Sequence, residues 1–231
     1  MMAKPKLLIA ATALVALAAC GNDPTREGAF ALAQSIAAST VGPLLGFGNE
    51  IEPAVSTPEA IAAVLPQLPP GPVLRIEIPN LENSAIAFQI STRAGYRTFA
   101  TVTGQTVTTR DEIVTSTRGF AWDIMSSATN GATQIIRRRG SGTVQRIYRY
   151  LSPMDDEFEV VATCTISPDG GERITLASGA QFSTTRMREV CQAEGESFTN
   201  LYWVTSGGNI PRSHQRISEE VGVFEIEVIR N

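Results

Sequence analysis

Alternation of apolar and polar residues with a period of two dominates this chain from residue 73 onward. From Phe158 to Ile166 every second residue is apolar, and Glu159, Thr163 and Thr165 occupy three of the four positions between them. Leu74 to Ile78 and Ile86 to Ile90 show the same alternation. This period places the apolar side chains on one face of an extended strand, which is typical of antiparallel sheets with one buried face. The chain is therefore expected to fold mainly as β-strands.

Further strand candidates recur at short spacing and are separated by turn sequences such as Pro168-Asp169-Gly170-Gly171 and Ser206-Gly207-Gly208-Asn209. These candidates are residues 96–103, 105–109, 112–117, 144–151, 173–177, 181–185, 198–205, 211–217 and 222–229. The pattern predicts an all-β fold, an antiparallel sandwich or open barrel of about 10–12 strands with one or two short helices.

Two segments interrupt the period of two and are expected to be helical. The first is Phe120–Ser127, in which apolar residues no longer alternate. The second is Arg186–Glu194, where Met187, Val190 and Cys191 stand at i, i+3 and i+4. That spacing predicts a short helix with Cys191 on its buried side.

The region before residue 73 is rich in prolines and is expected to contain two short helices. Residues 28–39 form an alanine-rich segment with a few larger apolar residues. Thr57 is expected to cap a helix that starts at Pro58 and runs to Leu65, because Pro66 cannot continue it.

The N-terminus has the order of a bacterial lipoprotein signal. Lys4 and Lys6 precede an apolar run of about ten residues, which is too short to span a bilayer, and small residues then lead to Cys20. The alternative is a plain secretory signal with an incidental cysteine. We expect residues 1–19 to be the signal, residues 20–72 a lipidated tether and arm, and residues 73–231 the β domain. Gly21 after the cysteine favours the outer membrane over retention in the inner membrane.

The cysteines indicate an oxidising compartment. Cys20 is expected to carry the lipid, which leaves Cys164 and Cys191 as an even pair. We expect a disulfide between them, which would contribute about 3–4 kcal/mol by the loop-entropy model. The chain has one histidine and no Cys-x-x-Cys spacing, so no metal site is expected.

Charge composition excludes several classes of function. Lys4 and Lys6 are the only lysines, so arginine supplies 17 of the 19 basic residues, against 23 acidic ones. A net acidic mature chain argues against general nucleic-acid binding, and the lack of lysine there excludes Schiff-base chemistry. No cofactor is expected.

Two segments of the chain form a recognisable pattern. One is Thr108 to Phe120 followed by Asp123 to Ser126, and the other is Phe198 to Trp203 with Ser213, Gln215 and Ile217 after it. Together they resemble the YjbF family, which comprises lipoproteins of exopolysaccharide and group 4 capsule loci. The resemblance extends over residues 73–217. It departs from the family where Asp111-Glu112 replaces a usual turn glycine, and where Ser218-Glu219-Glu220 stands near a usual proline.

The resemblance implies a mostly β protein, tethered by lipid to the outer membrane and facing the periplasm, with a role in polysaccharide secretion. It implies no enzymatic activity. The first hypothesis is therefore a non-enzymatic lipoprotein that assists exopolysaccharide or capsule export by binding glycan or a secretion partner. The alternatives are a polysaccharide hydrolase that acts through acidic residues and a structural envelope protein without a ligand.

Several residues are candidates for glycan or partner contacts, each with a plainer interpretation. Arginine suits recognition of carboxylates, so the basic run could contact an acidic polymer or lipid headgroups, or be a solvated loop. The aromatic residues could stack on sugar rings or pack within the sheet. The candidates are Arg137, Arg138, Arg139, Tyr148, Tyr150, Tyr202 and Trp203, with Trp122 as further aromatic material.

Two other features have a possible catalytic interpretation. His214 is either a general base or an ordinary histidine on a sheet face. The cluster Asp155-Asp156-Glu157 is either a glycosidic acid–base group or a solvated hairpin turn.

Overall fold

The computed structural model describes residues 57–120 and 122–231. Within them, twelve strands form one antiparallel sheet, accompanied by two α-helices and two short 3-10 helices. The strands are β1 (Val73–Ile78), β2 (Asn83–Arg93), β3 (Tyr96–Thr101), β4 (Thr106–Arg110), β5 (Ile113–Arg118), β6 (Asp123–Ser127), β7 (Gly142–Leu151), β8 (Glu157–Thr175), β9 (Gln181–Ala193), β10 (Glu196–Thr205), β11 (Arg212–Ser218) and β12 (Gly222–Arg230). The helices are α2 (Pro58–Val64), η2 (Leu65–Gln67), η3 (Pro79–Leu81) and α3 (Asn130–Arg137).

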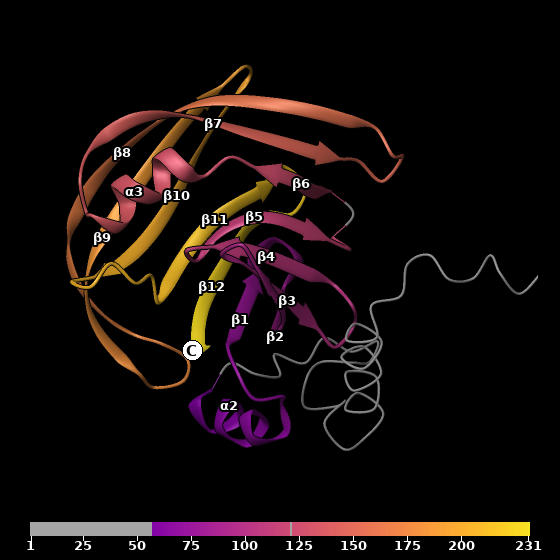
Figure 1. Ribbon diagram of the computed structural model, residues 1–231, viewed down its shortest axis with the longest axis vertical. Coiled ribbons are helices and arrows are strands. Elements are labelled where there is room, and N and C mark those ends of the chain that lie inside the picture. The colour runs from indigo at the N-terminus through magenta and orange to yellow at the C-terminus, as the bar shows by residue number, and fades with distance from the viewer. Residues whose placement is uncertain (1–56, 121) are drawn as a thin grey trace, which may run out of the picture.

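The sheet curls into a nearly closed barrel (Figure 1). Its order is β5-β4-β3-β2-β1-β12-β11-β10-β9-β8-β7-β6, so each strand pairs with its neighbour in sequence, except where β1 meets β12. The two edge strands, β5 and β6, come side by side without a ladder between them. Side chains join them instead: the Thr117 hydroxyl donates to Asp123 at 2.8 Å and accepts from the Ile124 amide at 2.9 Å. The predicted all-β antiparallel fold is confirmed.

The alternation recognised in the sequence places apolar side chains on the inner face of the barrel. The main core gathers residues from strands all round the sheet, among them Ile76, Phe99, Ala162 and Phe224, each at most 2% exposed. Disulfide-bonded Cys164 and Cys191 belong to the same core.

The helix α2 packs against the outer face of β1 and β2. Its predicted N-cap is confirmed, because the Thr57 hydroxyl accepts from the Ala60 amide at 3.2 Å and Pro58 is the first helical residue. Ile61 and Val64 form a second apolar cluster with Val73 and other outward residues of these strands. The last part of the region before the β domain therefore packs on the sheet. No helix in the described residues is long and apolar enough to cross a membrane.

The helix predicted over Arg186–Glu194 is wrong, because residues 186–193 belong to β9 and Glu194 lies in the turn that follows it. Met187, Glu189 and Cys191 alternate inward along the strand and are completely buried. A glutamate at the middle inward position concealed the period of two and left a helical spacing of apolar residues.

The helix predicted over Phe120–Ser127 is also wrong. Asp123–Ser127 forms β6, and a bulge between Ile124 and Ser126 breaks its alternation. The helix in this region is α3, which the sequence patterns did not indicate. Its residues Ala132 and Ile136 are buried among side chains of β5, β8, β9 and β10.

The disulfide expected between Cys164 and Cys191 is present, with an S–S distance of 2.03 Å. Cys164 on β8 and Cys191 on β9 are direct register partners. The bond therefore links two neighbouring strands rather than a strand and a helix.

The far end of the β8–β9 hairpin covers the outer face of β10 to β12. Ile174 and Leu176 pack on Trp203 in a separate apolar cluster. The Ala177 amide donates to the Glu227 carboxylate at 2.8 Å, which holds this end of the hairpin against β12. The hairpin thus buries an outward face of the sheet that would otherwise be exposed.

Candidate functional site

Five aromatic side chains form a continuous row from one end of the barrel into its core. Trp122 meets Phe158 edge to face with ring centroids 6.1 Å apart, and Phe158 stacks with Tyr150 at 5.2 Å. Tyr150 stacks with Tyr148 at 6.1 Å, and Tyr148 meets Phe198 at 5.8 Å. Exposure falls from 43% at Phe158 to 5% at Tyr150 and 2% at Tyr148. The exposed end of the row is Phe158 with Trp122, and Tyr150 is the buried ring directly beneath them; we call Trp122, Tyr150 and Phe158 the aromatic mouth.

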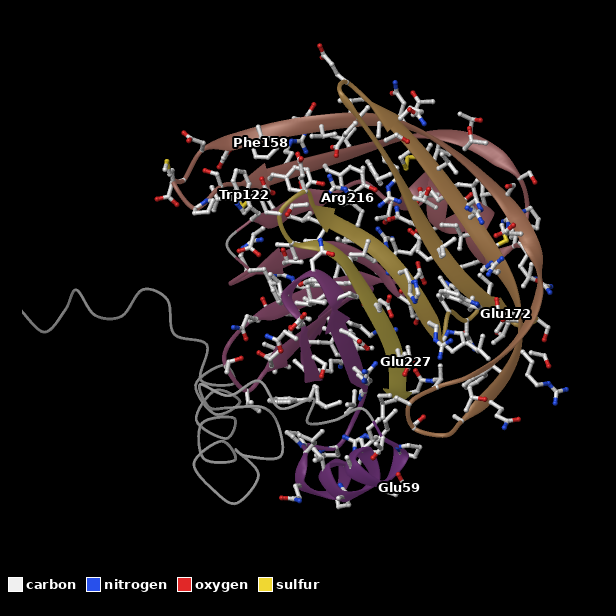
Figure 2. The ribbon with its side chains drawn as sticks, turned by 180° about the vertical axis from the view of Figure 1, so that it is seen from behind. Glu59, Trp122, Phe158, Glu172, Arg216 and Glu227 are labelled. Carbon is white, nitrogen blue, oxygen red and sulfur yellow. A yellow bond between two sulfur atoms is a disulfide. The ribbon has the colours of Figure 1, made fainter. Side chains whose placement is uncertain are left out.

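Strand pairing and one anchored loop build the mouth. Tyr148 and Tyr150 occupy alternate positions of β7, and Phe158 on β8 is the register partner of Tyr150. Trp122 lies in the connection from β5 to β6. The buried Asp123 carboxylate holds this connection, because it accepts from the Gly119 amide at 2.8 Å and from the amide of the next residue at 3.3 Å. Figure 2 shows Trp122 and Phe158 together at one end of the molecule.

Two hollows flank the mouth, and both are lined by Tyr150 and Phe158. The larger has a volume of about 390 Å³, within the range of small-ligand sites. The smaller has a volume of about 90 Å³. The remaining lining of the larger is Met125, Ser126, Arg149, Glu157 and Glu159, and that of the smaller is Val160, Glu196, Arg216, Ser218, Glu219 and Glu220.

The arginines of these hollows are already paired with carboxylates. Arg149 lies 2.8 Å from Glu159, and Arg216 forms an ion pair with Glu196. Arg216 also lies over the ring of Phe198, 5.6 Å from its centroid. Within the described residues, the lining acids Glu157, Glu219 and Glu220 form no ion pair, so the mouth carries an excess of negative charge.

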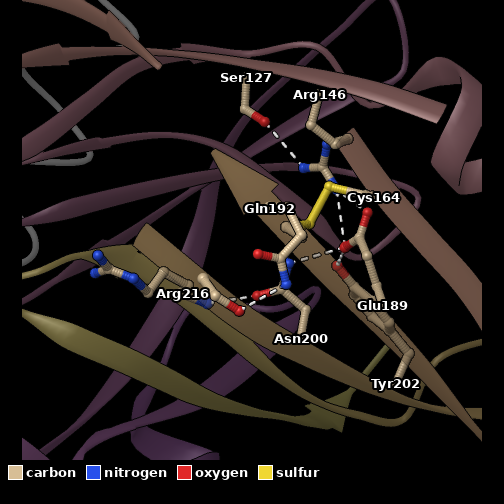
Figure 3. The surroundings of a disulfide bond; sticks show 10 residues. Ser127, Arg146, Cys164, Glu189, Gln192, Asn200, Tyr202 and Arg216 are labelled. Atoms are coloured by element: carbon tan, nitrogen blue, oxygen red, sulfur yellow. Dashed lines mark hydrogen bonds and ion pairs between the residues drawn. A yellow bond between two sulfur atoms is a disulfide. The ribbon is translucent and has the colours of Figure 1, made fainter. Parts of the chain in front are cut away.

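A buried polar network supports the inner end of the aromatic row (Figure 3). Both carboxylate oxygens of Glu189 accept from Arg146, at 2.8 and 3.0 Å, and the two side chains are 0% and 2% exposed. Glu189 also accepts from Asn200 at 2.8 Å and from Tyr202 at 2.9 Å. Asn200 in turn accepts from the backbone amide of Arg216 at 2.7 Å, which connects this network to the mouth.

Burial and charge set the protonation of this network. Burial lowers the pKa of the Arg146 guanidinium, but Tyr148 and Glu189 outweigh that effect and raise it overall. Burial raises the pKa of Tyr148 to about 12 and also raises that of Tyr202. Arg146 is thus charged and Tyr148 and Tyr202 are neutral at neutral pH, and the burial of Arg146 and Glu189 keeps both from any external substrate.

Cys164, Cys191 and Glu189 place three potential metal-ligand atoms within 4.8 Å of one another. The two sulfur atoms are joined in the disulfide. They therefore offer no thiolate, which is the form that binds metal.

The aromatic residues that the sequence suggested as glycan or partner contacts lie in different places in the structure. Tyr150 lines both hollows, whereas Tyr148 and Tyr202 are buried in the core. Trp203 is 5% exposed beneath the β8–β9 hairpin, and its indole donates to Glu172 at 2.9 Å. Burial favours the packing interpretation for Tyr148, Tyr202 and Trp203.

The arginine candidates lie at the opposite end of the barrel from the mouth. Strand β10 starts with Glu196 at the mouth, and the turn that follows it contacts Arg137 through a 3.0 Å hydrogen bond to the Gly208 carbonyl. Arg137 also forms an ion pair with Asp111, and Arg138 and Arg139 are exposed. The structure does not bring these arginines to the aromatic rings.

The structure gives the contacts of the two features that have a possible catalytic interpretation. His214 lies 3.6 Å from Glu225 and against the ring of Trp203. Burial lowers the pKa of His214, and the charge of Glu225 offsets only part of this shift. Asp155 and Asp156 lie in the exposed β7–β8 turn, where the Ser152 hydroxyl accepts from the Asp156 amide at 3.1 Å. The lipidation candidate Cys20, the signal and the helix expected over residues 28–39 lie outside the described residues.

Sequence reasoning noted Trp122 but placed it in a helix, and it did not single out Phe158, Glu196, Arg216, Glu219 or Glu220. Phe158 offered one signal, because it is a large apolar residue directly beside an acidic turn. No sequence signal indicated its contact with Trp122, because Trp122 in the β5–β6 connection and Phe158 on β8 are far apart in sequence.

Comparison with known proteins agrees with this architecture. The crystal structure of the hypothetical lipoprotein YmcC from Escherichia coli (K12) superposes with a TM-score of 0.64, covering 77% of this chain and 90% of that one at 14% identity. That likeness concerns the fold. No curated protein sequence matches the chain significantly. The family model described as "Group 4 capsule polysaccharide lipoprotein gfcB, YjbF" matches residues 48–229. The chain therefore belongs to the YjbF family, whose members are membrane-associated lipoproteins with a capsule- or exopolysaccharide-related role.

Proposed function

We propose that this lipoprotein assists export or assembly of a capsule or exopolysaccharide from the periplasmic side of the outer membrane, and that the aromatic mouth binds the glycan. In this proposal residues 1–19 are the signal, Cys20 carries the lipid, and residues 20–72 connect the anchor to the β domain of residues 73–231. The family assignment supports the connection with polysaccharide.

One observation carries the glycan-binding role: an aromatic row whose outer end is exposed beside a hollow of about 390 Å³. The C–H groups on one face of a pyranose ring are apolar and pack well against an aromatic ring, while its hydroxyls need polar partners. Phe158 and Trp122 supply the rings, and the carboxylates and arginines of the hollows supply hydrogen-bonding groups.

Rigidity of the mouth further supports a binding role. A surface that is already ordered loses little conformational entropy when it binds. Tyr150 is fixed between Phe158 and Tyr148, and Asp123 anchors the connection that carries Trp122. Phe158 and Tyr150 therefore stand on strands, and Trp122 stands on a short connection that Asp123 anchors.

Co-purification tests the proposal. The tagged, full-length lipoprotein is isolated from its native membrane, and the accompanying glycan and proteins are analysed. We expect polymer to be recovered with the wild type and to be lost with Phe158→Ala. Tyr96→Ala is the matched control, because Tyr96 is 39% exposed and lies at the turn between β2 and β3, away from the mouth.

Recovery of neither polymer nor an export protein would contradict the proposal. Equal recovery of polymer with Phe158→Ala and wild type would contradict the assignment of the mouth. Shortening of the polymer by the purified protein would instead favour a hydrolase.

A further inference from the structure

We propose that the aromatic mouth selects a cationic glycan, one whose amino sugars carry free ammonium groups, over neutral or acidic polymers. This inference rests on the proposed glycan-binding function and names the class of polymer. It combines the charge around the mouth with the type of surface at its centre.

The charge of the two hollows is negative after their internal pairs are subtracted. The Arg149–Glu159 and Arg216–Glu196 pairs balance themselves. Glu157 in one hollow and Glu219 and Glu220 in the other are exposed and have no ion-pair partner among the described residues. Asp155 and Asp156 add to the same sign in the neighbouring β7–β8 turn. A ligand with positive charge would find several carboxylates on both sides of the rings.

The rings themselves favour the same ligand class. A cation is attracted to the face of an aromatic ring, and tryptophan is the best side chain for this interaction. Phe158 lines both hollows together with their acidic residues, and the partly exposed Trp122 contacts Phe158 edge to face. An amino sugar could place its apolar ring face on one aromatic side chain and its ammonium group near a carboxylate.

The arginine at this end of the molecule that forms no ion pair among the described residues is Arg118, which is exposed at the end of β5 and already donates to the Thr117 and Ile124 carbonyls. The unpaired carboxylates of Asp155, Asp156, Glu157, Glu219 and Glu220 outnumber it. Arg216 already forms an ion pair with Glu196 and lies over the ring of Phe198. The consecutive arginines Arg137 to Arg139 lie at the opposite end of the barrel, where Arg137 pairs with Asp111. A uronate at the mouth would therefore meet mainly like charge.

Isothermal titration of the full mature lipoprotein in detergent tests this selectivity. The probes are tetramers of glucosamine, of N-acetylglucosamine and of galacturonic acid, which share size and differ in charge. At an ionic strength of about 0.05 M we expect the glucosamine tetramer to bind about tenfold more tightly than the N-acetylated one, and the galacturonate tetramer to bind least. Near 1 M salt, where screening acts over about 3 Å, the preference should largely disappear.

Variants separate charge from stacking. Glu219→Gln/Glu220→Gln should reduce affinity for the glucosamine tetramer about three- to tenfold and leave the N-acetylated tetramer unchanged. Phe158→Ala should weaken the binding of both tetramers. The matched control for the single variant Glu220→Gln is Glu59→Gln. Glu59→Gln removes an exposed carboxylate on α2 at the other end of the molecule (Figure 2) and should change the affinity for neither tetramer.

The outcomes distinguish this inference from the function on which it rests. Equal or tighter binding of the neutral or acidic tetramer would overturn the charge selectivity and leave glycan binding intact. Binding of none of the tetramers would count against the glycan-binding function itself. If oligolysine of equal charge binds as tightly as the glucosamine tetramer, and Phe158→Ala does not affect it, the mouth is an acidic docking face for protein and the inference is overturned.

Discussion

Two arginines of strand β7, Arg146 and Arg149, each form an ion pair with a glutamate, but in opposite surroundings. Arg146 points into the barrel and meets Glu189 with both side chains at most 2% exposed, whereas Arg149 points outward and meets Glu159 with both side chains more than 40% exposed. In the buried pair Arg146 also donates to the Ser127 hydroxyl, and Glu189 also accepts from Asn200 and Tyr202, whereas the exposed pair lines a hollow at the mouth. The comparison teaches that burial, and not residue type, decides whether a charge specifies the fold or stays available to a ligand.

Removal of one buried partner should have the largest effect. Glu189→Gln leaves the Arg146 cation buried without a counter-charge, so we expect the free energy of unfolding to fall by about 3–5 kcal/mol in urea titrations. Glu159→Gln is the control, because an exposed pair contributes about 0–1 kcal/mol. Equal losses for the two variants would break the comparison.

Truncation of the aromatic row should follow the same gradient of burial. Phe198→Ala removes a ring that is 8% exposed and should cost about 3–4 kcal/mol of unfolding free energy. Phe158→Ala removes a ring that is 43% exposed, so the cost should be about 1–2 kcal/mol. Thermal or urea unfolding measures both. A larger loss at Phe158 would mean that the mouth is a structural element instead of a binding surface.

Alkaline pH should lower the free energy of unfolding through Tyr148, which lies beside the buried Arg146–Glu189 pair, and over one pH unit this effect should be smaller than those of Glu189→Gln and Phe198→Ala. Burial raises the pKa of Tyr148 to about 12, whereas an unfolded tyrosine has a pKa near 10. The contribution of Tyr148 is complete below about pH 10 and is lost as the pH rises toward 12, because the unfolded chain releases its proton first. We expect a slope of about 1.4 kcal/mol per pH unit from this group.

Reversible unfolding at about pH 9 and about pH 11 measures this slope. Tyr148→Phe should make the slope of unfolding free energy against pH shallower, because this variant lacks the ionisable hydroxyl group and keeps the ring. A wild-type free energy of unfolding that is unchanged over this range would show that the tyrosines are less well shielded than their burial indicates.

The turn between β4 and β5 shows how local and distant forces combine. Asp111 and Glu112 both adopt positive φ, 52° and 64°, a backbone region that residues other than glycine rarely adopt. Each carboxylate forms an ion pair with an arginine from elsewhere, Arg137 for Asp111 and Arg97 for Glu112. The sequence left the type of this turn open, because nothing local reveals the two arginines.

The sequence by itself determined the all-β antiparallel class, the α2 cap at Thr57 and the Cys164–Cys191 pairing. Each of these depends on residue order over a short span or on counting cysteines, which sequence patterns report directly. Tertiary structure alone decided that residues 186–193 belong to a strand, that α3 exists, and that Trp122 meets Phe158. The physical reason is that a buried charge such as Glu189 is tolerable only beside partners from other strands, and that an exposed ring becomes part of a site only when a distant segment is placed beside it.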